Sequence, residues 1–339
     1  MENLVQKVYE QQNLSKQEMR QVADQIFQGN LSEAELGALL VALKIKGETI
    51  EEITAIAEAM QEVALKLPVS ELRAMDNCGT GGDRSGSFNI STTAAFVLAA
   101  AGIPVAKHGN RSISSKSGSA DVLAELGVGI TQSEAELSRL LNEVGIAFLF
   151  APAVHPNMKY VMPVRQKLAT PTVFNLIGPL TNPAPLEAQL VGIYRGDLLE
   201  QIAYVLKNLG RKRAVVVHGA GGLDEATLAG VNHYAYLNQN QITLHQFAPE
   251  DVGLKQMPLE AIRGGDAKTN AVILKQVLKG EPSAYLDTTL LNAGLGLFAY
   301  GRVDTIEKGV ELSREIIHSG AAFAKLQELI EKQKEVVAG

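Results

Sequence analysis

The stretch Asp76-Asn77-Cys78-Gly79-Thr80-Gly81-Gly82-Asp83 places three glycines in four positions, shortly before a helix predicted from Ser91 or Thr92 to Ala101. Closely spaced glycines allow positive φ angles and close backbone approach, so successive N–H groups can face an anion. A helix N-terminus adds free N–H donors and a favourable dipole. The glycines alone fit a plain turn between a strand and a helix equally well. The hydroxyls and Asn89 at the helix start favour anion binding.

This glycine loop does not match the two commonest nucleotide motifs. After Gly79-Thr80-Gly81, a dinucleotide fingerprint needs a third glycine where the chain has Arg84. A Walker loop would close with Gly-Lys-Ser or Gly-Lys-Thr, which the loop lacks. Both motifs are therefore excluded for this loop.

Outward from the loop, short apolar runs alternate with helical stretches after Leu67-Pro68. Runs that suit buried strands are residues 105–107, 146–150, 190–194 and 214–218. Alternating strands and helices predict a largely parallel sheet with helices on both faces. Residues 242–247 indicate a more exposed strand, for which we expect antiparallel pairing. From Ala267 onward the chain is predicted to be helical, with breaks at residues 280–282 and at Gly301.

The first 65 or so residues are predicted to be helical throughout. Three capping boxes occur, pairing a hydroxyl with a carboxylate three residues later: Ser15 with Glu18, Ser32 with Glu35, and Thr49 with Glu52. Apolar stripes at helical spacing follow the three boxes, at Met19, Val22, Ile26 and Phe27, at Leu36, Leu39, Leu40 and Leu43, and at Ile53, Ile56, Met60 and Val63. Gly29 and Gly47 stand where helix ends are expected. We predict a small helical domain over residues 1–67 and an α/β domain over residues 68–339.

Two further loops follow predicted strands. The first, Lys107-His108-Gly109-Asn110-Arg111 and its serine-rich continuation to Ser119, suits a second phosphate or, equally, a solvated basic loop. Its place one helix after the glycine loop favours a shared pocket, because ligands of open α/β sheets lie beyond the carboxyl ends of the strands. The second, Gly219-Ala220-Gly221-Gly222-Leu223-Asp224-Glu225, offers adjacent carboxylates that could hold Mg²⁺ beside a phosphate or simply stabilise a helix N-terminus.

Arg165 and Cys78 are open to two interpretations each. The Arg165 guanidinium suits a planar carboxylate, although a lone arginine near a helix is usually a surface residue. Cys78 could be a nucleophile, but a small buried hydrophobe is the commoner role. The histidines at 108, 155 and 218 show no metal-ligand spacing.

Composition excludes several classes of protein. The 339 residues are 46% hydrophobic and 20% charged, as in an ordinary globular protein. The net charge of −6 disfavours nucleic-acid binding, and the single cysteine excludes an internal disulfide. Residues 94–106, the longest run without charge or strong polarity, fall short of the ~18 residues of a membrane span. The N-terminus lacks a secretory signal, so we expect a cytoplasmic protein without membrane partners.

The order and spacing of six motifs resemble the anthranilate phosphoribosyltransferases of tryptophan biosynthesis. These motifs are GTGGD, NIST, KHGNRSISSKSGSAD, HPNMKYVMPVR, FNLIGPLTNPA and GLDE, and the similarity covers nearly the whole chain. The resemblance implies transfer of a 5-phosphoribosyl group from phosphoribosyl pyrophosphate to the amine of anthranilate, with Mg²⁺ as cofactor. It implies a small all-helical domain, joined by a later helical piece around residues 163–183, and a larger α/β domain of the nucleoside phosphorylase/phosphoribosyltransferase type. It also implies a homodimer through the small domain.

The resemblance assigns roles residue by residue. The implied donor-binding residues are Gly79, Gly82, Asp83, Ser87, Asn89, Ile90, Ser91, Thr92, Lys107, His108, Gly109, Asn110, Arg111, Ser112, Ile113, Ser114, Ser115 and Ser119. The implied anthranilate contacts are Gly79, Asn110 and Arg165, and the implied Mg²⁺ ligands are Ser91, Asp224 and Glu225. Lys107 and His108 are the candidate catalytic residues, although we expect positioning to dominate, with no indispensable general base.

Two departures from the family pattern occur, at Ser87, where threonine is usual, and at Thr170-Pro171-Thr172, where an arginine usually precedes the threonine. One alternative is a pyrimidine nucleoside phosphorylase, whose loop usually reads GTGGVGDK; here Asp83 follows the glycines directly. The other is a related non-catalytic protein that binds nucleic acid, against which the net charge weighs.

Overall fold

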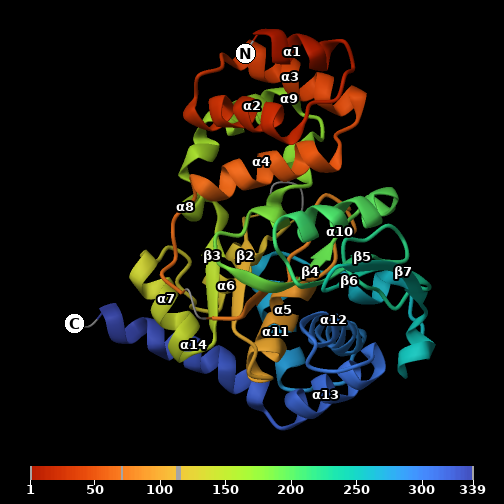
Figure 1. Ribbon diagram of the computed structural model, residues 1–339. Helices are drawn as coiled ribbons and strands as arrows, with labels where there is room; N and C mark the ends of the chain where they lie inside the picture. The colour runs from red at the N-terminus through yellow and green to blue at the C-terminus, as the bar shows by residue number, and fades with distance from the viewer. Residues whose placement is uncertain (1, 70–71, 112–115, 338–339) are drawn as a thin grey trace.

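The computed structural model describes residues 2–69, 72–111 and 116–337 (Figure 1). Four helices form a bundle at the N-terminal end: α1 (Glu2–Tyr9), α2 (Lys16–Gln28), α3 (Glu33–Lys46) and α4 (Ile50–Glu62). All three predicted capping boxes are present, each with both of its hydrogen bonds, at the starts of α2, α3 and α4. The helical character of this segment is therefore confirmed.

The predicted apolar stripes face the core of the bundle, with one exception. Residues of α2, α3 and α4 such as Phe27, Leu40 and Ile56 are almost completely buried. The prediction is wrong for Val63, which stands at the C-cap of α4 and is 38% exposed. Once a helix has ended, the 3.6-residue spacing no longer fixes the direction of a side chain.

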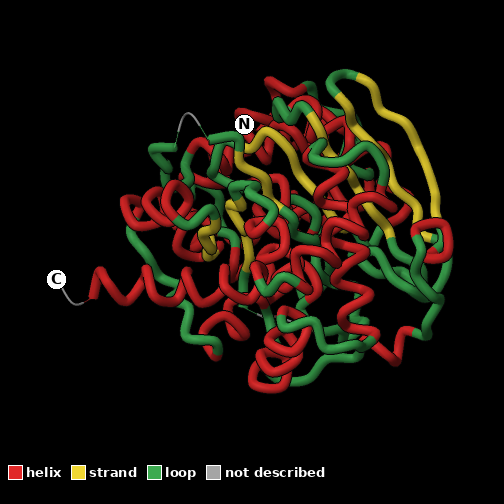
Figure 2. The backbone as a smooth tube through the Cα atoms, turned by 90° about the horizontal axis from the view of Figure 1, so that it is seen from below, coloured by secondary structure: helices red, strands yellow, loops and turns green. Residues whose placement is uncertain are grey.

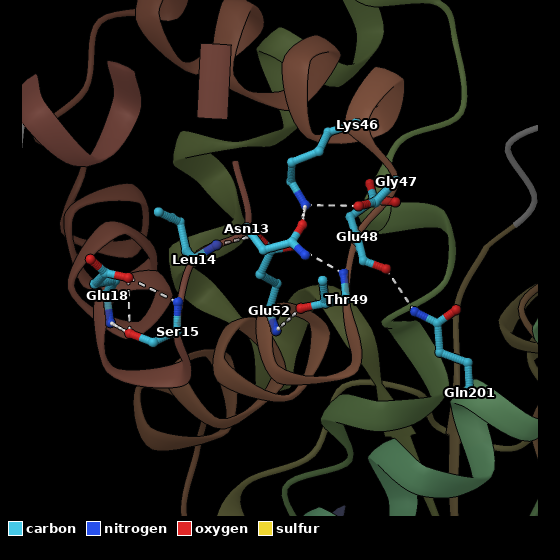
Figure 3. A network of polar contacts seen from close by, with 10 residues as sticks. All are labelled: Asn13, Leu14, Ser15, Glu18, Lys46, Gly47, Glu48, Thr49, Glu52 and Gln201. Carbon is cyan, nitrogen blue, oxygen red and sulfur yellow. Dashed lines mark hydrogen bonds and ion pairs between the residues drawn. The ribbon is translucent and has the colours of Figure 1, made fainter. Parts of the chain in front are cut away.

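A buried ion pair fixes the turn between α3 and α4 (Figure 3). The Glu52 carboxylate accepts hydrogen bonds from the backbone N–H groups of Leu14 (2.9 Å) and Thr49 (2.8 Å), and pairs with the Lys46 ammonium at 2.7 Å. Next to it, Gln201 donates from its amide to the Glu48 carbonyl (2.7 Å), which ties the bundle to the rest of the fold. Glu52 therefore organises the bundle through backbone hydrogen bonds and the ion pair with Lys46.

A seven-stranded sheet forms the centre of the remaining chain. Its strands are β1 (Ala74–Asp76), β2 (Val105–Gly109), β3 (Ile146–Phe150), β4 (Leu186–Gly192), β5 (Arg213–His218), β6 (Asn232–Asn238) and β7 (Gln241–Phe247). In the order β3-β2-β1-β4-β5-β6-β7, the first five strands run parallel, and β6 and β7 pair antiparallel. The predicted mostly parallel sheet is confirmed, as is the antiparallel strand at 242–247.

Helices cover both faces of the sheet (Figure 2). On β5, Val215 and Val217 pack into the core shared with α5 (Ile90–Ala100) and α12 (Ala284–Tyr300), while Ala214 and Val216 pack towards α10 (Leu199–Asn208). The remaining helices of this part are α6 (Ser119–Glu125), α7 (Glu134–Glu143), α8 (Ala151–Val154), α9 (Met162–Leu168), α11 (Ala267–Leu278), α13 (Ile306–His318) and α14 (Ala321–Val337). The described residues contain no helix that is both long and apolar enough to cross a membrane.

A later segment returns to pack on the N-terminal bundle. It comprises the 3₁₀ turn Pro156–Tyr160, helix α9, and the 3₁₀ turns Val173–Asn175 and Gly178–Thr181. Phe174 meets Phe27 edge-on with ring centroids 6.2 Å apart, and the Asn157 amide donates to the Phe27 carbonyl at 2.9 Å. This segment, called here the return segment (155–182), therefore links the bundle to the edge of the sheet.

Candidate active site

The predicted loops lie at the carboxyl ends of the parallel strands. The 79–83 loop follows β1, residues 107–111 end β2, and the 219–225 loop follows β5. The first and third loops are hydrogen-bonded to each other: the Gly81 N–H donates to Asp224 Oδ2 at 2.6 Å. The Ser91 N–H, in the first turn of α5, donates to Glu225 Oε1 at 3.2 Å. The acidic pair therefore faces both the glycine loop and the helix start.

Close backbone packing holds the acidic pair in place. The glycine loop continues the sheet, since Gly79 bridges to Gly192 and the Thr80 N–H donates to the Gly192 carbonyl at 2.9 Å. A Cβ atom on Gly192 would lie 1.5 Å from the carbonyl oxygen of Asp224, and one on Gly219 would lie 2.0 Å from that of Glu225. Only glycine leaves room for the acidic pair at either position. Sequence reasoning missed Gly192, which lies at the end of β4 and in no motif.

The glycine loop has the backbone conformation that the sequence predicted. Gly81 and Gly82 have φ angles of 68° and 87°, in the left-handed region that side chains rarely occupy. The Asp83 carboxylate accepts from the Ser85 N–H (3.1 Å), and the Ser85 hydroxyl donates to that of Ser87 (3.2 Å). The loop is thus organised by its own short polar contacts.

Three carboxylates concentrate negative charge at this edge of the sheet. Burial, together with the charges of Glu225 and Asp83, raises the pKa of Asp224 well above its ordinary value. Burial also raises the pKa of Glu225 to about 7, against the opposing effect of Lys107. Carboxylate oxygens are the ligands that Mg²⁺ prefers, and a cation would relieve this repulsion. The side chains present therefore fit a magnesium ion at Asp224 and Glu225.

The start of α5 is connected to the beginning of α6. Asn89 caps α5, and Ile90, Ser91 and Thr92 form its first turn. The Asn89 amide accepts from Asn270 Nδ2 at 2.9 Å, and its own Nδ2 group donates to the Ser117 carbonyl at 3.4 Å. Asn270, on α11, thus orients Asn89; the candidate site residues did not include it.

The basic segment 107–111, predicted as a loop, divides into buried residues in the last part of β2 and exposed residues beyond it. Lys107 is only 3% exposed and His108 4%, so a solvated basic loop does not describe them. Arg111 is exposed and pairs with Asp121 at 2.8 Å. The Asn110 N–H donates to the Ser119 hydroxyl (3.2 Å), which donates to the Asn110 carbonyl (3.1 Å). A Cβ on Gly109 would lie 2.3 Å from that hydroxyl oxygen. Residues 112–115, also predicted to bind the donor, lie outside the described residues.

His108, a candidate catalytic residue, faces the return segment. Its Nδ1–H donates to the Gly178 carbonyl (3.1 Å), which leaves a lone pair on Nε2, and Nε2 has no hydrogen-bond partner among the described residues. The His155 ring packs edge-on against it, with centroids 5.2 Å apart. Burial lowers the pKa of His108 and lowers that of His155 to about 2. A neutral imidazole here can accept a hydrogen bond at Nε2 but is a weak base.

Arg165 lies on α9 within the return segment and is partly buried. It approaches the Phe174 ring at 6.0 Å, and its guanidinium donates to Met162 Sδ at 3.7 Å. Burial lowers its pKa, yet a guanidinium stays charged in proteins. Within the described residues it has no carboxylate partner and no hydrogen bond to Gly79 or Asn110. The cation is therefore free to bind a ligand, although among the described residues no hydrogen bond joins Gly79, Asn110 and Arg165 to one another.

Comparison with known proteins defines the class. A family model described as the helical bundle domain of a glycosyl transferase family matches residues 2–64, and the a/b domain of that family matches residues 71–323. The chain therefore has the two domains of this glycosyl transferase family.

The relatives are more specific. Proteins named anthranilate phosphoribosyltransferase from Listeria monocytogenes and Lactococcus lactis are 65% and 55% identical to the chain, covering 100% and 98% of it and 100% and 99% of the relatives. The crystal structure of such an enzyme from Thermus thermophilus is 41% identical with a TM-score of 0.93, covering 98% of this chain and 99% of that one. A yeast enzyme in complex with PRPP and Mg is 26% identical with a TM-score of 0.87, covering 95% and 94%. The chain belongs to the anthranilate phosphoribosyltransferase family.

Proposed function

We propose that the protein transfers the 5-phosphoribosyl group of phosphoribosyl pyrophosphate to the amine of anthranilate, releasing pyrophosphate, in tryptophan biosynthesis. The observation that carries this proposal is the Asp224–Glu225 pair, hydrogen-bonded to Gly81 and Ser91 at the start of α5. The yeast relative with PRPP and Mg supports it, because its whole fold superposes on this chain. Neither the phosphorylase nor the nucleic-acid-binding alternative is favoured by the relatives.

In this proposal the donor lies between the glycine loop, the first turn of α5 and the basic residues of β2. Ser91, Asp224 and Glu225 would hold Mg²⁺, which supplies positive charge to the departing pyrophosphate. Backbone N–H groups of the glycine loop and the Lys107 ammonium add fixed positive charge without reorganisation. The aromatic amine of anthranilate is neutral at pH 7, so it attacks without a strong base. The residues of this chain therefore act mainly by orienting the two substrates.

We further propose that residues 1–67 and the piece around 163–183 form the small domain, that two copies pair through it, and that the enzyme is cytoplasmic. The edge-on contact of Phe174 with Phe27 and the hydrogen bond from Asn157 to the Phe27 carbonyl support grouping this piece with the bundle. Size-exclusion chromatography with light scattering measures the oligomer, for which we expect a dimer.

Anthranilate fluorescence tests the proposed reaction. With phosphoribosyl pyrophosphate and Mg²⁺, fluorescence should decay with time, and chelation of the metal should stop the decay. No decay with Mg²⁺ present would refute the function. Phosphorolysis of thymidine or uridine would instead support the phosphorylase, and salt-sensitive DNA binding without transfer would support the nucleic-acid-binding alternative.

Replacing Arg165 by alanine should raise the KM for anthranilate about 10- to 100-fold and that for the donor less than about threefold. The reason is that a free guanidinium in the return segment is suited to the acceptor's carboxylate, and a charged hydrogen bond contributes about 1.5–3 kcal/mol. Lys167→Ala is the matched control, since this exposed cation of the same helix pairs with Glu33 at the surface. Equal increases in the KM for anthranilate and the KM for the donor in Arg165→Ala would contradict the assignment of Arg165 to the anthranilate carboxylate.

Mg²⁺ should stabilise the protein more at pH 8 than at pH 5. Because the pKa of Glu225 is raised from 4.5 to about 7 in the folded state, the folded protein favours protonated Glu225, and stability is lost as pH rises through 7. Each unit by which the folded-state pKa is raised corresponds to at most about 1.4 kcal/mol of the free energy of unfolding. Thermal unfolding at both pH values, with and without Mg²⁺, measures this effect. Between pH 5 and pH 8, metal-free Glu225→Gln should lose less stability than the metal-free wild type. An identical pH dependence of the two proteins would contradict the prediction.

A further inference from the structure

A completely buried carboxylate, Asp76, stands at the carboxyl end of β1 and has no assigned function. Its Oδ1 atom accepts from the backbone N–H groups of Asn77 (2.8 Å) and His108 (3.1 Å). Its Oδ2 atom accepts from Asn182 Nδ2 (2.9 Å) and from the Cys78 thiol (3.2 Å). Each oxygen therefore accepts two hydrogen bonds, and no ion pair neutralises this carboxylate among the described residues.

The four donors belong to three different parts of the site. Asn77 and Cys78 begin the glycine loop, His108 ends β2, and Asn182 ends the return segment. Asn182 also donates to the Ala106 carbonyl at 2.8 Å, so it is hydrogen-bonded to β2 as well as to Asp76 on β1. Asn77 in turn donates from its side chain to the Ser91 carbonyl at 2.8 Å, which extends the connection to the first turn of α5.

A metal site is a competing interpretation of this cluster. Ligand atoms of Asp76, Cys78 and His108 lie within 4.8 Å of one another. Both carboxylate oxygens, however, are already occupied by N–H and S–H donors, and burial together with the charge of Asp76 raises the pKa of the Cys78 thiol. A thiol that stays protonated and donates a hydrogen bond is not a metal ligand. The cluster is therefore a hydrogen-bonded junction.

We propose that Asp76 is a positioning residue, which fixes the donor side of the active site relative to the acceptor side. This inference rests on the proposed function, because the glycine loop and α5 serve the donor and the return segment serves the acceptor. A reaction between two bound substrates depends on their alignment, and a misplacement of about 1 Å can cost on the order of 100-fold in rate. Asp76 holds the segments that set this alignment without touching either substrate.

The variant Asp76→Asn tests the inference with a minimal change of shape. One carboxylate oxygen becomes an NH₂ group that faces N–H or S–H donors, so at least one of the four hydrogen bonds is lost and the segments separate. We expect kcat to fall about 100-fold, while both KM values change less than about threefold, because each substrate keeps its own contacts. Steady-state kinetics by anthranilate fluorescence and thermal unfolding are measured on the same preparation.

Glu52→Gln is the matched control, because Glu52 is a second completely buried carboxylate that accepts backbone N–H hydrogen bonds, and it lies in the bundle. It should lower the melting temperature without the fall in kcat. If the two variants lose kcat in proportion to their loss of stability, Asp76 is merely structural and the inference is overturned. Full kcat in folded Asp76→Asn also overturns it.

A second variant, Asn182→Ala, serves if Asp76→Asn does not fold. It leaves the carboxylate in place and releases only the return segment, so kcat should fall about 10-fold with the donor KM unchanged. An unchanged kcat in this variant counts against the inference. Inactive wild-type enzyme would refute the proposed function instead, so the two failures are distinguishable.

Discussion

Replacing Asp224 and Glu225 together by alanine should lower kcat at least about 1,000-fold and abolish the response to Mg²⁺. A factor of 1,000 corresponds to about 4 kcal/mol of transition-state stabilisation, which is within what a bound metal supplies to a departing polyanion. These two carboxylates lie side by side over the Gly81 and Ser91 N–H groups. Titrating Mg²⁺ against initial rate, and directly by calorimetry, measures both effects.

The same variant should keep or gain stability without metal at pH 8. The raised pKa values of Asp224 and Glu225 mean that ionising them costs free energy in the folded state, so their removal relieves that cost. Loss of activity with an unchanged or higher melting temperature therefore separates a lost metal site from a misfolded protein. Alanine at Glu250 and Asp251, an exposed adjacent acidic pair, is the matched control and should retain activity. A wild-type Mg²⁺ response in the Asp224/Glu225 variant would contradict the metal assignment.

The sequence predicted the helices of the bundle and most of the sheet because those signals are local. A capping box is a contact between residues three apart, so Ser15 with Glu18 reveals the start of α2 without knowledge of the fold. Runs such as 146–150 are strands because they are apolar and bounded by turns. Strand β1 escaped prediction because three residues give no periodic pattern, and β6 because its polar ends and a partly buried tyrosine hide its alternation. The start of β4 was placed four residues too late, at 190 instead of Leu186.

The candidate site was predictable where its chemistry lies in the loops themselves. The glycine loop, the basic residues after β2 and the acidic pair each carry a recognisable group of residues, and the structure brings the first and third into hydrogen-bonding contact. Asn182 and Asn270 were not singled out, because a single amide has no signature and acquires its role only when distant segments meet. The pairing of Arg111 with Asp121 likewise depends on the fold, which brings the residues just after β2 beside α6.

Replacing Gly192 by alanine is the second change for which we expect a large effect, and it tests how the acidic pair is held. The new methyl group would lie 1.5 Å from the Asp224 carbonyl oxygen, so the two must separate by about 2 Å to reach ordinary contact at 3.4 Å or more. A shift of this size exceeds the ~1 Å that can cost 100-fold in rate. We therefore expect kcat to fall more than about 100-fold and Mg²⁺ affinity to weaken, with a loss of stability of roughly 1–3 kcal/mol from overpacking.

Gly37→Ala is the matched control for this change, because the substitution is chemically the same but the new methyl group would meet only Val164, at 3.7 Å, and Leu168. Since Gly37 lies inside α3, alanine should leave activity intact and stabilise the protein by about 0.5–1 kcal/mol. Activity and Mg²⁺ binding of Gly192→Ala should be measured well below its melting temperature, where the variant is folded. Near-normal kcat and Mg²⁺ affinity under those conditions would mean that β4 and the 219–225 loop can separate without moving the carboxylates. The close approach at Gly192 would then matter for packing alone, because the metal site would have tolerated the displacement of the 219–225 loop from β4.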